Sequence, residues 1–141
     1  MNTKEISLKL YKDSPADPEN GRARSLHYHI IDKGTRSVAG IIDLRLSDSD
    51  DMKMYAGQVG YLVKPQFRGR SYAAKACLLL KKVAIKHKMS HLWITCNPEN
   101  LASRITCERI GSQLVEIVHL PKENPLYQKG ERRKCRYHWV L

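Results

Sequence analysis

The sequence predicts a mixed α/β (α+β) fold in which helices flank a central, mostly antiparallel sheet. Several short segments rich in β-branched and aromatic residues are bounded by turn residues, as strands are. The segment 70–88 instead carries apolar residues at the spacing of an amphipathic helix. Because it lies between two strand-like segments, it predicts a β-α-β unit whose two strands are parallel and joined by a right-handed crossover.

The strands follow from hydrophobic patterning. Residues 6–12 alternate in the manner of a strand, and residues 13–25, with two prolines and a glycine, are predicted to form a loop. The segments 26–32 and 37–46 flank the sequence KGTR and predict a hairpin. The segment 58–63 alternates little, so we expect a central strand. The remaining predicted strands are 91–97, 112–120 and 135–141.

Two helices are predicted. The short one follows Pro98 and ends at Gly111, because proline suits a first helical turn and glycine suits a C-cap. The acidic segment 47–53 and the basic segment 121–134 are predicted to be loops. The long helix covers 70–88, and its core-facing residues are expected to be Ala73, Ala76, Cys77, Leu80, Val83 and Ala84.

Length and composition indicate a globular protein. A chain of 141 residues predicts a single domain, 1–141, that is long enough to bury a sizeable core. No apolar run approaches the ~18 residues of a membrane span, so no membrane partner is expected. The first ten residues lack the apolar stretch of a signal peptide, which favours a cytoplasmic location.

The cysteines and histidines predict no metal site. The four cysteines form no CxxC pair, and we expect reduced thiols in the cytosol. His27 and His29 share a strand face, but no third ligand lies nearby in the sequence.

The net charge of +11 points to an anionic partner or ligand. Nucleic acid, a phosphorylated cofactor and a membrane surface all meet that description. No RNP, KH or zinc-finger pattern is present, and aromatic residues make up only 7% of the chain. Both observations argue against nucleic acid as the partner.

The sequence RGRS at 68–71 predicts an anion site. A glycine-containing turn that leads into a helix leaves backbone N–H groups free, and the helix dipole adds partial positive charge there. Arg68 and Arg70 would add charged donors for phosphate oxygens. The turn is neither a Walker loop nor a GxGxxG fingerprint. A surface turn with solvated arginines remains the alternative from these residues alone.

Two motifs together resemble the GNAT N-acetyltransferase superfamily. QFRGRS at 66–71 is similar to its acetyl-CoA loop, Q/R-x-x-G-x-G/A, and NPENLASRITCERIG at 97–111 is similar to its later N-x-x-S…E-K-x-G motif. The resemblance covers roughly 38–141 and is nearest to the branch of ribosomal-protein acetyltransferases and related bacterial enzymes. It implies an acetyl-CoA-dependent N-acetyltransferase in which an amine attacks the thioester directly in a ternary complex.

The resemblance also implies which residues hold acetyl-CoA. Backbone N–H groups of 68–73 would cradle the pyrophosphate, and the strand at 61–63 would pair with the pantetheine. In the family the central parallel strands splay apart beyond this point, and the pantetheine enters the gap. Asn100 matches the motif asparagine that holds the pantetheine arm. The full set of implied cofactor-binding residues is Tyr61, Leu62, Val63, Gln66, Arg68, Gly69, Arg70, Ser71, Tyr72, Ala73, Asn97, Asn100 and Ser103.

The catalytic residues implied by the resemblance are Ser103 and Cys107. Members of the family often carry a tyrosine that protonates the departing thiolate, and Cys107 stands at that position. The serine-containing branch uses the motif serine, here Ser103. Gln58 stands where a glutamate often acts as base, and Ser71 replaces the last small residue of the loop.

The N-terminal part departs most from the family. Family members place two helices after the first strand, whereas only the loop 13–25 is available here. The acceptor site is therefore expected to be open or completed by a second subunit, which favours a homodimer. A protein N-terminus, a small amine, an amino sugar and an antibiotic all remain open as acceptors.

Two other functions remain open from the sequence. A non-catalytic acyl-CoA-binding domain would bind the cofactor without turnover. A nucleic-acid-binding module would show a steep dependence of binding on salt.

Overall fold

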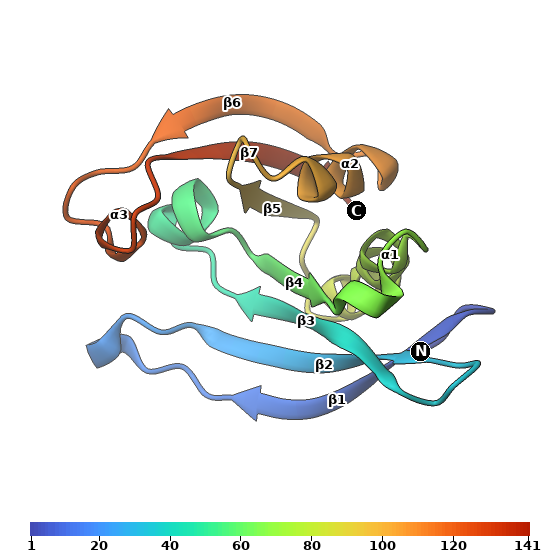
Figure 1. The fold of residues 1–141 in the computed structure, drawn as a ribbon. Helices are drawn as coiled ribbons and strands as arrows, with labels where there is room; N and C mark the ends of the chain where they lie inside the picture. Colours follow the sequence, from blue (N-terminus) through green and yellow to red (C-terminus); the bar gives the residue numbers. More distant parts are fainter.

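The computed structural model describes residues 1–141 and confirms the mixed fold. Its strands form two sheets that lie side by side, with the orders β1-β2-β3-β4 and β5-β7-β6 (Figure 1). Neighbouring strands within each sheet are antiparallel. The strands are β1 (Ile6–Ser14), β2 (Arg24–Asp32), β3 (Val38–Leu46), β4 (Val59–Val63), β5 (His91–Cys96), β6 (Gln113–His119) and β7 (Arg133–Val140). The helices are α1 (Tyr72–Lys86), α2 (Leu101–Arg109) and α3 (Pro125–Gln128).

The first sheet is built from two hairpins and packs one face on α1. Every second residue of β2 is buried, including Leu26, Tyr28 and Ile30, which matches the alternation of the sequence. Between β1 and β2 the chain forms only a single 3-10 turn at 18–20. The expected reduction of the N-terminal helices is thus present. The predicted loop at 13–25 is shorter, because both strands extend into it.

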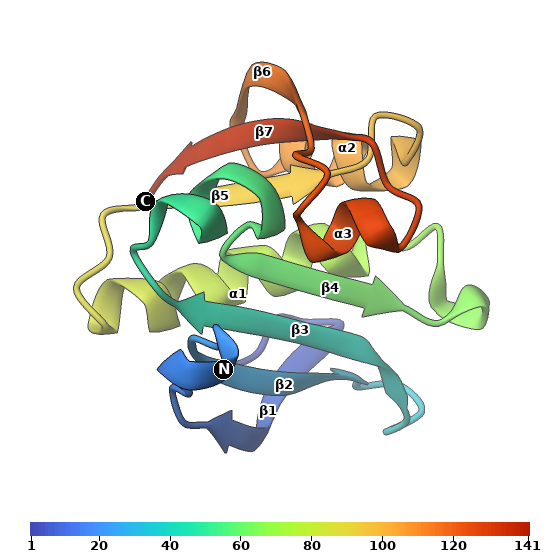
Figure 2. The same ribbon diagram turned by 90° about the vertical axis from the view of Figure 1, so that its left-hand side faces the viewer.

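The two sheets meet at Gln58 and then diverge. The Gln58 N–H donates to the carbonyl oxygen of Trp93 at 2.7 Å, and its side-chain oxygen accepts from the Trp93 N–H at 2.8 Å. Figure 2 shows β4 and β5 pointing the same way, as the β-α-β prediction requires. They belong to different sheets, so the two parallel strands separate, as the family resemblance implies. The predicted central strand, β4, is therefore the edge of its own sheet in the middle of the molecule.

Helix α1 lies between the sheets and begins two residues later than predicted. Its buried face is wider than the predicted stripe because it contacts the first sheet on one side and α2 on another. Ala74 is buried, whereas the predicted core residue Ala73 is only partly buried. The buried residues of α1 are Tyr72, Ala74, Ala76, Cys77, Leu79, Leu80, Val83 and Ala84.

Two segments predicted as loops contain a turn of helix. The segment Met52–Ala56 forms a π-helical turn after the acidic residues. Helix α3 lies within 121–134, and Asn124 caps it by accepting a hydrogen bond from the Leu126 N–H at 2.9 Å.

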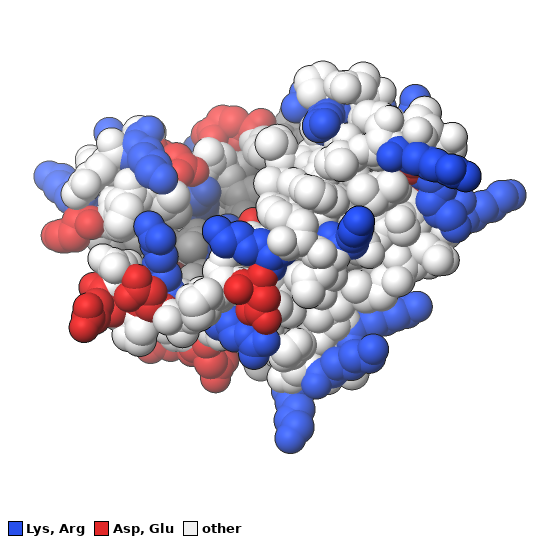
Figure 3. Space-filling view, turned by 90° about the horizontal axis from the view of Figure 1, so that it is seen from below, with Lys and Arg blue, Asp and Glu red and all other residues white.

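The surface reflects the charge of the chain. In Figure 3 the Lys and Arg side chains spread over the whole face, whereas Asp and Glu gather towards its left side. No helix in the structure is both long and apolar enough to cross a membrane.

Candidate active site

A cavity of about 470 Å³ lies where β4, the turn before α1, and α2 come together. The strand forms one wall and the face of α2 forms the other. Ten of the thirteen residues predicted to bind the cofactor line it. The lining residues are Tyr61, Leu62, Val63, Phe67, Arg68, Gly69, Ser71, Tyr72, Ala73, Asn100, Ala102, Ser103, Ile105, Thr106 and Arg109.

One end of the cavity is a cradle of free backbone N–H groups. No N–H group from Gly69 to Ala74 donates a hydrogen bond within the protein, because the helical bonds of α1 begin further along the chain. Gly69 and Ser71 have φ values of +81° and +58°, which turn successive N–H groups to one side. The Arg68 N–H is already bonded to the Pro65 carbonyl, so the cradle begins one residue later than predicted.

The arginines around this cradle differ from the prediction. Arg68 lines the cavity, and its Nε donates to the Val63 carbonyl at 3.3 Å. Arg70 turns away from the cavity and lies 3.8 Å from Asp32. Its place is taken by Arg109 at the end of α2, whose guanidinium donates to the Ser71 hydroxyl at 2.5 Å. Two cations therefore flank the cradle, but they come from different segments of the chain.

At the other end of the cavity, Tyr61 meets Ser103. The Tyr61 hydroxyl and the Ser103 hydroxyl lie 2.6 Å apart and share a hydrogen bond. Asn100 holds the start of α2 by accepting a hydrogen bond from the Ser103 N–H at 3.1 Å. Burial, reinforced by the nearby Cys107, raises the pKa of Tyr61 far above its ordinary value. The pair therefore holds two neutral hydroxyls at this end of the cavity.

Cys107 lies behind this pair and lines neither wall of the cavity. Its side chain is fully buried, and its sulfur is 3.9 Å from the Tyr61 hydroxyl. Burial raises the pKa of the Cys107 thiol to about 12, so the thiol is protonated at neutral pH.

The backbone of β4 also faces the gap. The Lys64 N–H donates to Ala39 of the first sheet, and the Gln58 carbonyl accepts from Arg45 of β3. Because strand residues alternate in direction, the N–H groups of Tyr61 and Val63 point away from β3, towards α2 and β5.

A second cavity of about 350 Å³ lies on the far side of the Tyr61–Ser103 pair. It shares Tyr61, Asn100 and Ser103 with the first cavity, so the two meet at the hydroxyl pair. Asn97, predicted to bind the cofactor, lines this second cavity instead. Its other lining residues are Arg45, Ala56, Val59, Gly60, Thr95, Cys96, Leu126, Glu131 and Lys134.

The remaining predicted residues lie outside the first cavity. Neither Gln66 nor Arg70 lines it. Sequence reasoning missed five residues that do: Phe67, Ala102, Ile105, Thr106 and Arg109. The four on α2 repeat at i, i+3, i+4 and i+7, so the helical period measured from Ala102 could have identified that face.

The sequence matches the family of the acetyltransferase (GNAT) domain over residues 5–113. No curated protein matches the chain significantly.

Solved structures share its fold. The microcin C7 self-immunity acetyltransferase MccE, in complex with acetyl-CoA and AMP, aligns with a TM-score of 0.65 at 20% identity, over 89% of this chain and 64% of its own. The ribosomal-protein-S5-alanine acetyltransferase of Vibrio fischeri aligns with a TM-score of 0.65 at 14% identity, over 82% of this chain and 61% of its own. A GNAT-family acetyltransferase of Bacillus anthracis aligns with a TM-score of 0.61 at 21% identity, over 81% of this chain and 65% of its own. The chain thus spans less than two thirds of the length of each of these proteins.

Proposed function

Because the chain belongs to the GNAT acetyltransferase family, we propose that it is an N-acetyltransferase that moves an acetyl group from acetyl-CoA to an amine. The first cavity would hold the cofactor, and the second would admit the amine. The observation that carries this proposal is that the two cavities meet at the Tyr61–Ser103 hydroxyl pair, while the N–H cradle closes the opposite end of the first.

The cradle suits the pyrophosphate of coenzyme A. Free N–H groups at a helix start, with Arg68 and Arg109 beside them, provide the donors that phosphate oxygens accept from. The pantetheine would lie along Tyr61–Val63, whose outward N–H groups can pair with its amides. The complex of MccE with acetyl-CoA shows that a protein with this fold binds that cofactor.

The proposed reaction is a direct attack in a ternary complex. The amine nitrogen adds to the thioester carbonyl carbon, and the resulting oxyanion accepts a hydrogen bond from a β4 N–H, a contact worth about 3–4 kcal/mol of transition-state stabilisation. The C–S bond then breaks, and Ser103 donates a proton to the departing thiolate. Holding amine and thioester together supplies about 7–11 kcal/mol of the barrier reduction.

The proton balance uses groups at the two ends of the hydroxyl pair. Tyr61 can return a proton to Ser103 because their hydroxyls are hydrogen-bonded. The amine loses its proton to water in the second cavity, and water returns a proton to Tyr61, so both hydroxyls end the cycle protonated. Glu131, the only carboxylate that lines this cavity, is paired with Lys134 at 2.6 Å. Gln58, which stands where family members often have glutamate, is occupied in bridging Trp93 and Ser47. Cys107 would remain a neutral packing residue behind Ser103.

Our proposal that a second subunit completes the acceptor site is supported by the reduced N-terminal part, where the β1–β2 connection forms only a single 3-10 turn. The acceptor would be a small amine or a protein N-terminus that reaches Ser103 through the second cavity. No metal takes part in the proposed steps.

The proposal is tested by turnover. The protein is incubated with acetyl-CoA and a mixture of primary amines, and thiol release is measured together with acetylated products by mass spectrometry. We expect thiol and acetyl-amine in equal amounts, and loss of both in Gly69→Glu, which places a carboxylate at the cradle. Cofactor binding without turnover would instead indicate a non-catalytic acyl-CoA-binding domain.

A further inference from the structure

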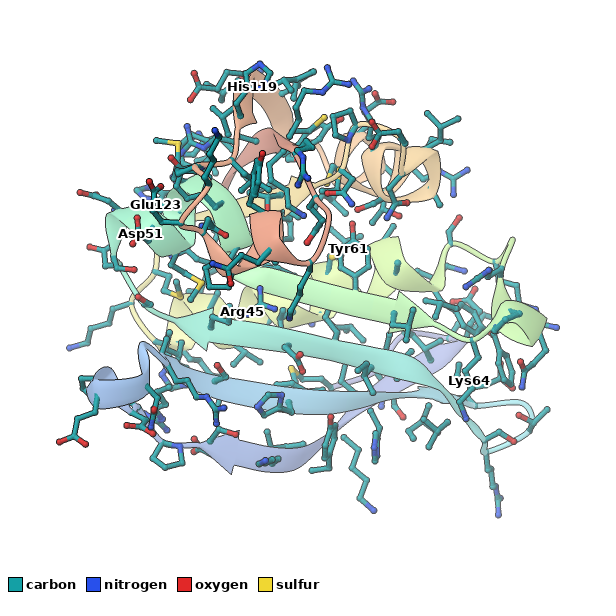
Figure 4. All side chains as sticks on the ribbon, turned by 60° about the vertical axis from the view of Figure 1, so that its left-hand side comes forward. Arg45, Asp51, Tyr61, Lys64, His119 and Glu123 are labelled. Carbon is teal, nitrogen blue, oxygen red and sulfur yellow. The ribbon has the colours of Figure 1, made fainter.

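The second cavity contains a cation without an anionic partner. Arg45 of β3 lines it, and it also lines a cavity of about 560 Å³ beside the β1–β2 turn. In Figure 4 Arg45 and Tyr61 lie in the middle of the molecule on neighbouring strands, whereas Lys64 lies at the far end of β4. Arg45 therefore stands next to the proposed place of acetyl transfer.

The guanidinium is fixed by its neighbours. Its Nη1 donates to the carbonyl oxygens of Ala56 at 3.3 Å and Gly57 at 2.9 Å. It lies against Gly60, where an added Cβ would come within 2.9 Å of Nη2. A side chain at position 60 would therefore displace the end of Arg45.

The rest of the guanidinium is free to bind. Nε and Nη2 donate no hydrogen bond within the protein, and neither atom is fully buried. Nη2 is the nitrogen nearest Gly60. Gly60 lines the second cavity but not the cavity beside the β1–β2 turn. An unused donor, Nη2, thus lies on the side of the second cavity.

Burial makes this cation receptive to an anion. Desolvation lowers the pKa of Arg45, and the charge of Asp43 offsets only part of that effect. Asp43 itself is hydrogen-bonded to His27 at 2.8 Å, so it is engaged elsewhere. A partly buried guanidinium without an ion pair gains more from a bound carboxylate than a solvated one does.

The other charged groups of the second cavity neutralise one another. Lys134 is nearly fully buried and pairs with Glu131 at 2.6 Å. The charge that remains uncompensated is that of Arg45.

We infer that the acceptor is an amine that carries a carboxylate or another anionic group close to the reacting nitrogen, and that Arg45 selects it. The inference rests on the proposed acetyl transfer and adds a substrate class to it. The guanidinium lies against Gly60, and Arg45 and Ser103 line the same cavity of about 350 Å³. An anion bound at Arg45 would therefore hold a small amine, such as an amino acid, in the cavity that also contains Ser103.

The test compares matched ligands that differ only in charge. Acceptors are paired as amino acids and their carboxamides, and kcat/KM is measured for each pair. In parallel, the N-acetyl amino acid and its carboxamide are titrated into the CoA-bound protein, which reports selectivity without turnover. Amino-alkyl phosphates form a third arm that separates carboxylate from phosphate recognition.

We expect the carboxylate to be preferred by about tenfold or more in both measurements, the worth of a charge-assisted hydrogen bond. Arg45→Gln, which removes the charge, should abolish this preference, and Arg45→Lys should restore part of it. Arg24→Gln removes an equal charge from β2, outside both cavities of the proposed site, and should leave the preference intact.

The outcomes are distinguishable. Equal binding of carboxylate and carboxamide by the wild-type protein overturns the role of Arg45, whether or not turnover occurs. A preference that persists in Arg45→Gln also overturns it. Failure to bind acetyl-CoA or CoA overturns the proposed function, and the substrate class with it.

Discussion

At the scale of single residues, the site depends on side chains brought together from distant parts of the chain. Ser103 could be identified from its motif because the short spacing to Asn100 is local. Arg109 could not, since nothing in the sequence near it shows that α2 ends beside Ser71, and Arg70 was chosen instead. Asp32, which draws Arg70 away, lies 38 positions earlier in the sequence.

Replacing Ser103 with Ala tests the proposed proton donor. The change removes the hydroxyl that Tyr61 contacts at 2.6 Å but leaves the cradle intact. We expect kcat to fall about a hundredfold while the KM for acetyl-CoA changes little. Steady-state kinetics beside Ser37→Ala, an exposed serine in the β2–β3 turn, measures the effect. An unchanged kcat would remove Ser103 from this role.

Two arginine variants test the corrected cradle. Arg109→Gln should weaken acetyl-CoA binding about tenfold, because a charged donor beside the pyrophosphate is lost. Arg70→Gln removes the same charge from a residue outside the cavity and should weaken binding far less. Calorimetric titration gives both dissociation constants, and the reverse order would contradict the assignment.

At the scale of elements, the start of α1 is held by the β2–β3 turn. Asp32 is buried and accepts hydrogen bonds from the Tyr72 hydroxyl and from the N–H and hydroxyl of Thr35, the latter two at 2.9 and 2.8 Å. Tyr72 is the first residue of α1 and also lines the first cavity. The turn therefore fixes the direction from which the cradle faces the ligand.

Tyr72→Phe tests this attachment. The Tyr72 hydrogen bond is the largest cause of the lowered pKa of Asp32, followed by the bonds from Thr35. Because the pKa of Asp32 is lowered in the folded state, its ionised carboxylate stabilises the folded protein at pH values above the unfolded pKa of 3.8. This stabilisation is lost as the pH falls below that value. The variant should therefore have a lower urea midpoint at pH 7, with a smaller difference at pH 3. An equal difference at both pH values would contradict this reading.

Most strands and helices could be predicted from the hydrophobic pattern of the sequence, but their arrangement in space could not. Hydrophobic patterning and bounding turn residues located the seven strands, and the period of 70–88 located α1. The family resemblance implies that β4 and β5 separate, but the residues alone do not show it, because the separation depends on how Gln58 bonds across to Trp93. Helix α3 was missed because it has only four residues and no apolar period.

At the scale of the whole molecule, the two sheets enclose a shared core that contains buried thiols. All four cysteines are free and buried. Burial raises the pKa of Cys77 and of Cys107 above the ordinary 9.0. The core is therefore stable only while these groups keep their protons.

Alkaline unfolding follows from these thiols. Below pH 9 they are protonated in both states, so their contribution to stability is complete. Above it the unfolded chain loses the protons first, while folded Cys107 holds its proton up to about pH 12. At pH 10 we expect each thiol to reduce the free energy of unfolding by about 1.4 kcal/mol. Urea titrations at pH 8 and 10 measure this, and Cys107→Ala should show a smaller loss than the wild-type protein.

The central claim is that the cavity between β4 and α2 binds acetyl-CoA. Thermal unfolding with and without acetyl-CoA, at moderate salt and beside a polyphosphate control, tests it most directly. Ligand at 100 times its Kd should add about 2.7 kcal/mol of stability, which raises Tm by several degrees for a domain of this size. We predict this shift with acetyl-CoA, none with polyphosphate, and its loss in Gly69→Glu. No shift at saturating acetyl-CoA, or an equal shift with any polyanion, would contradict the account.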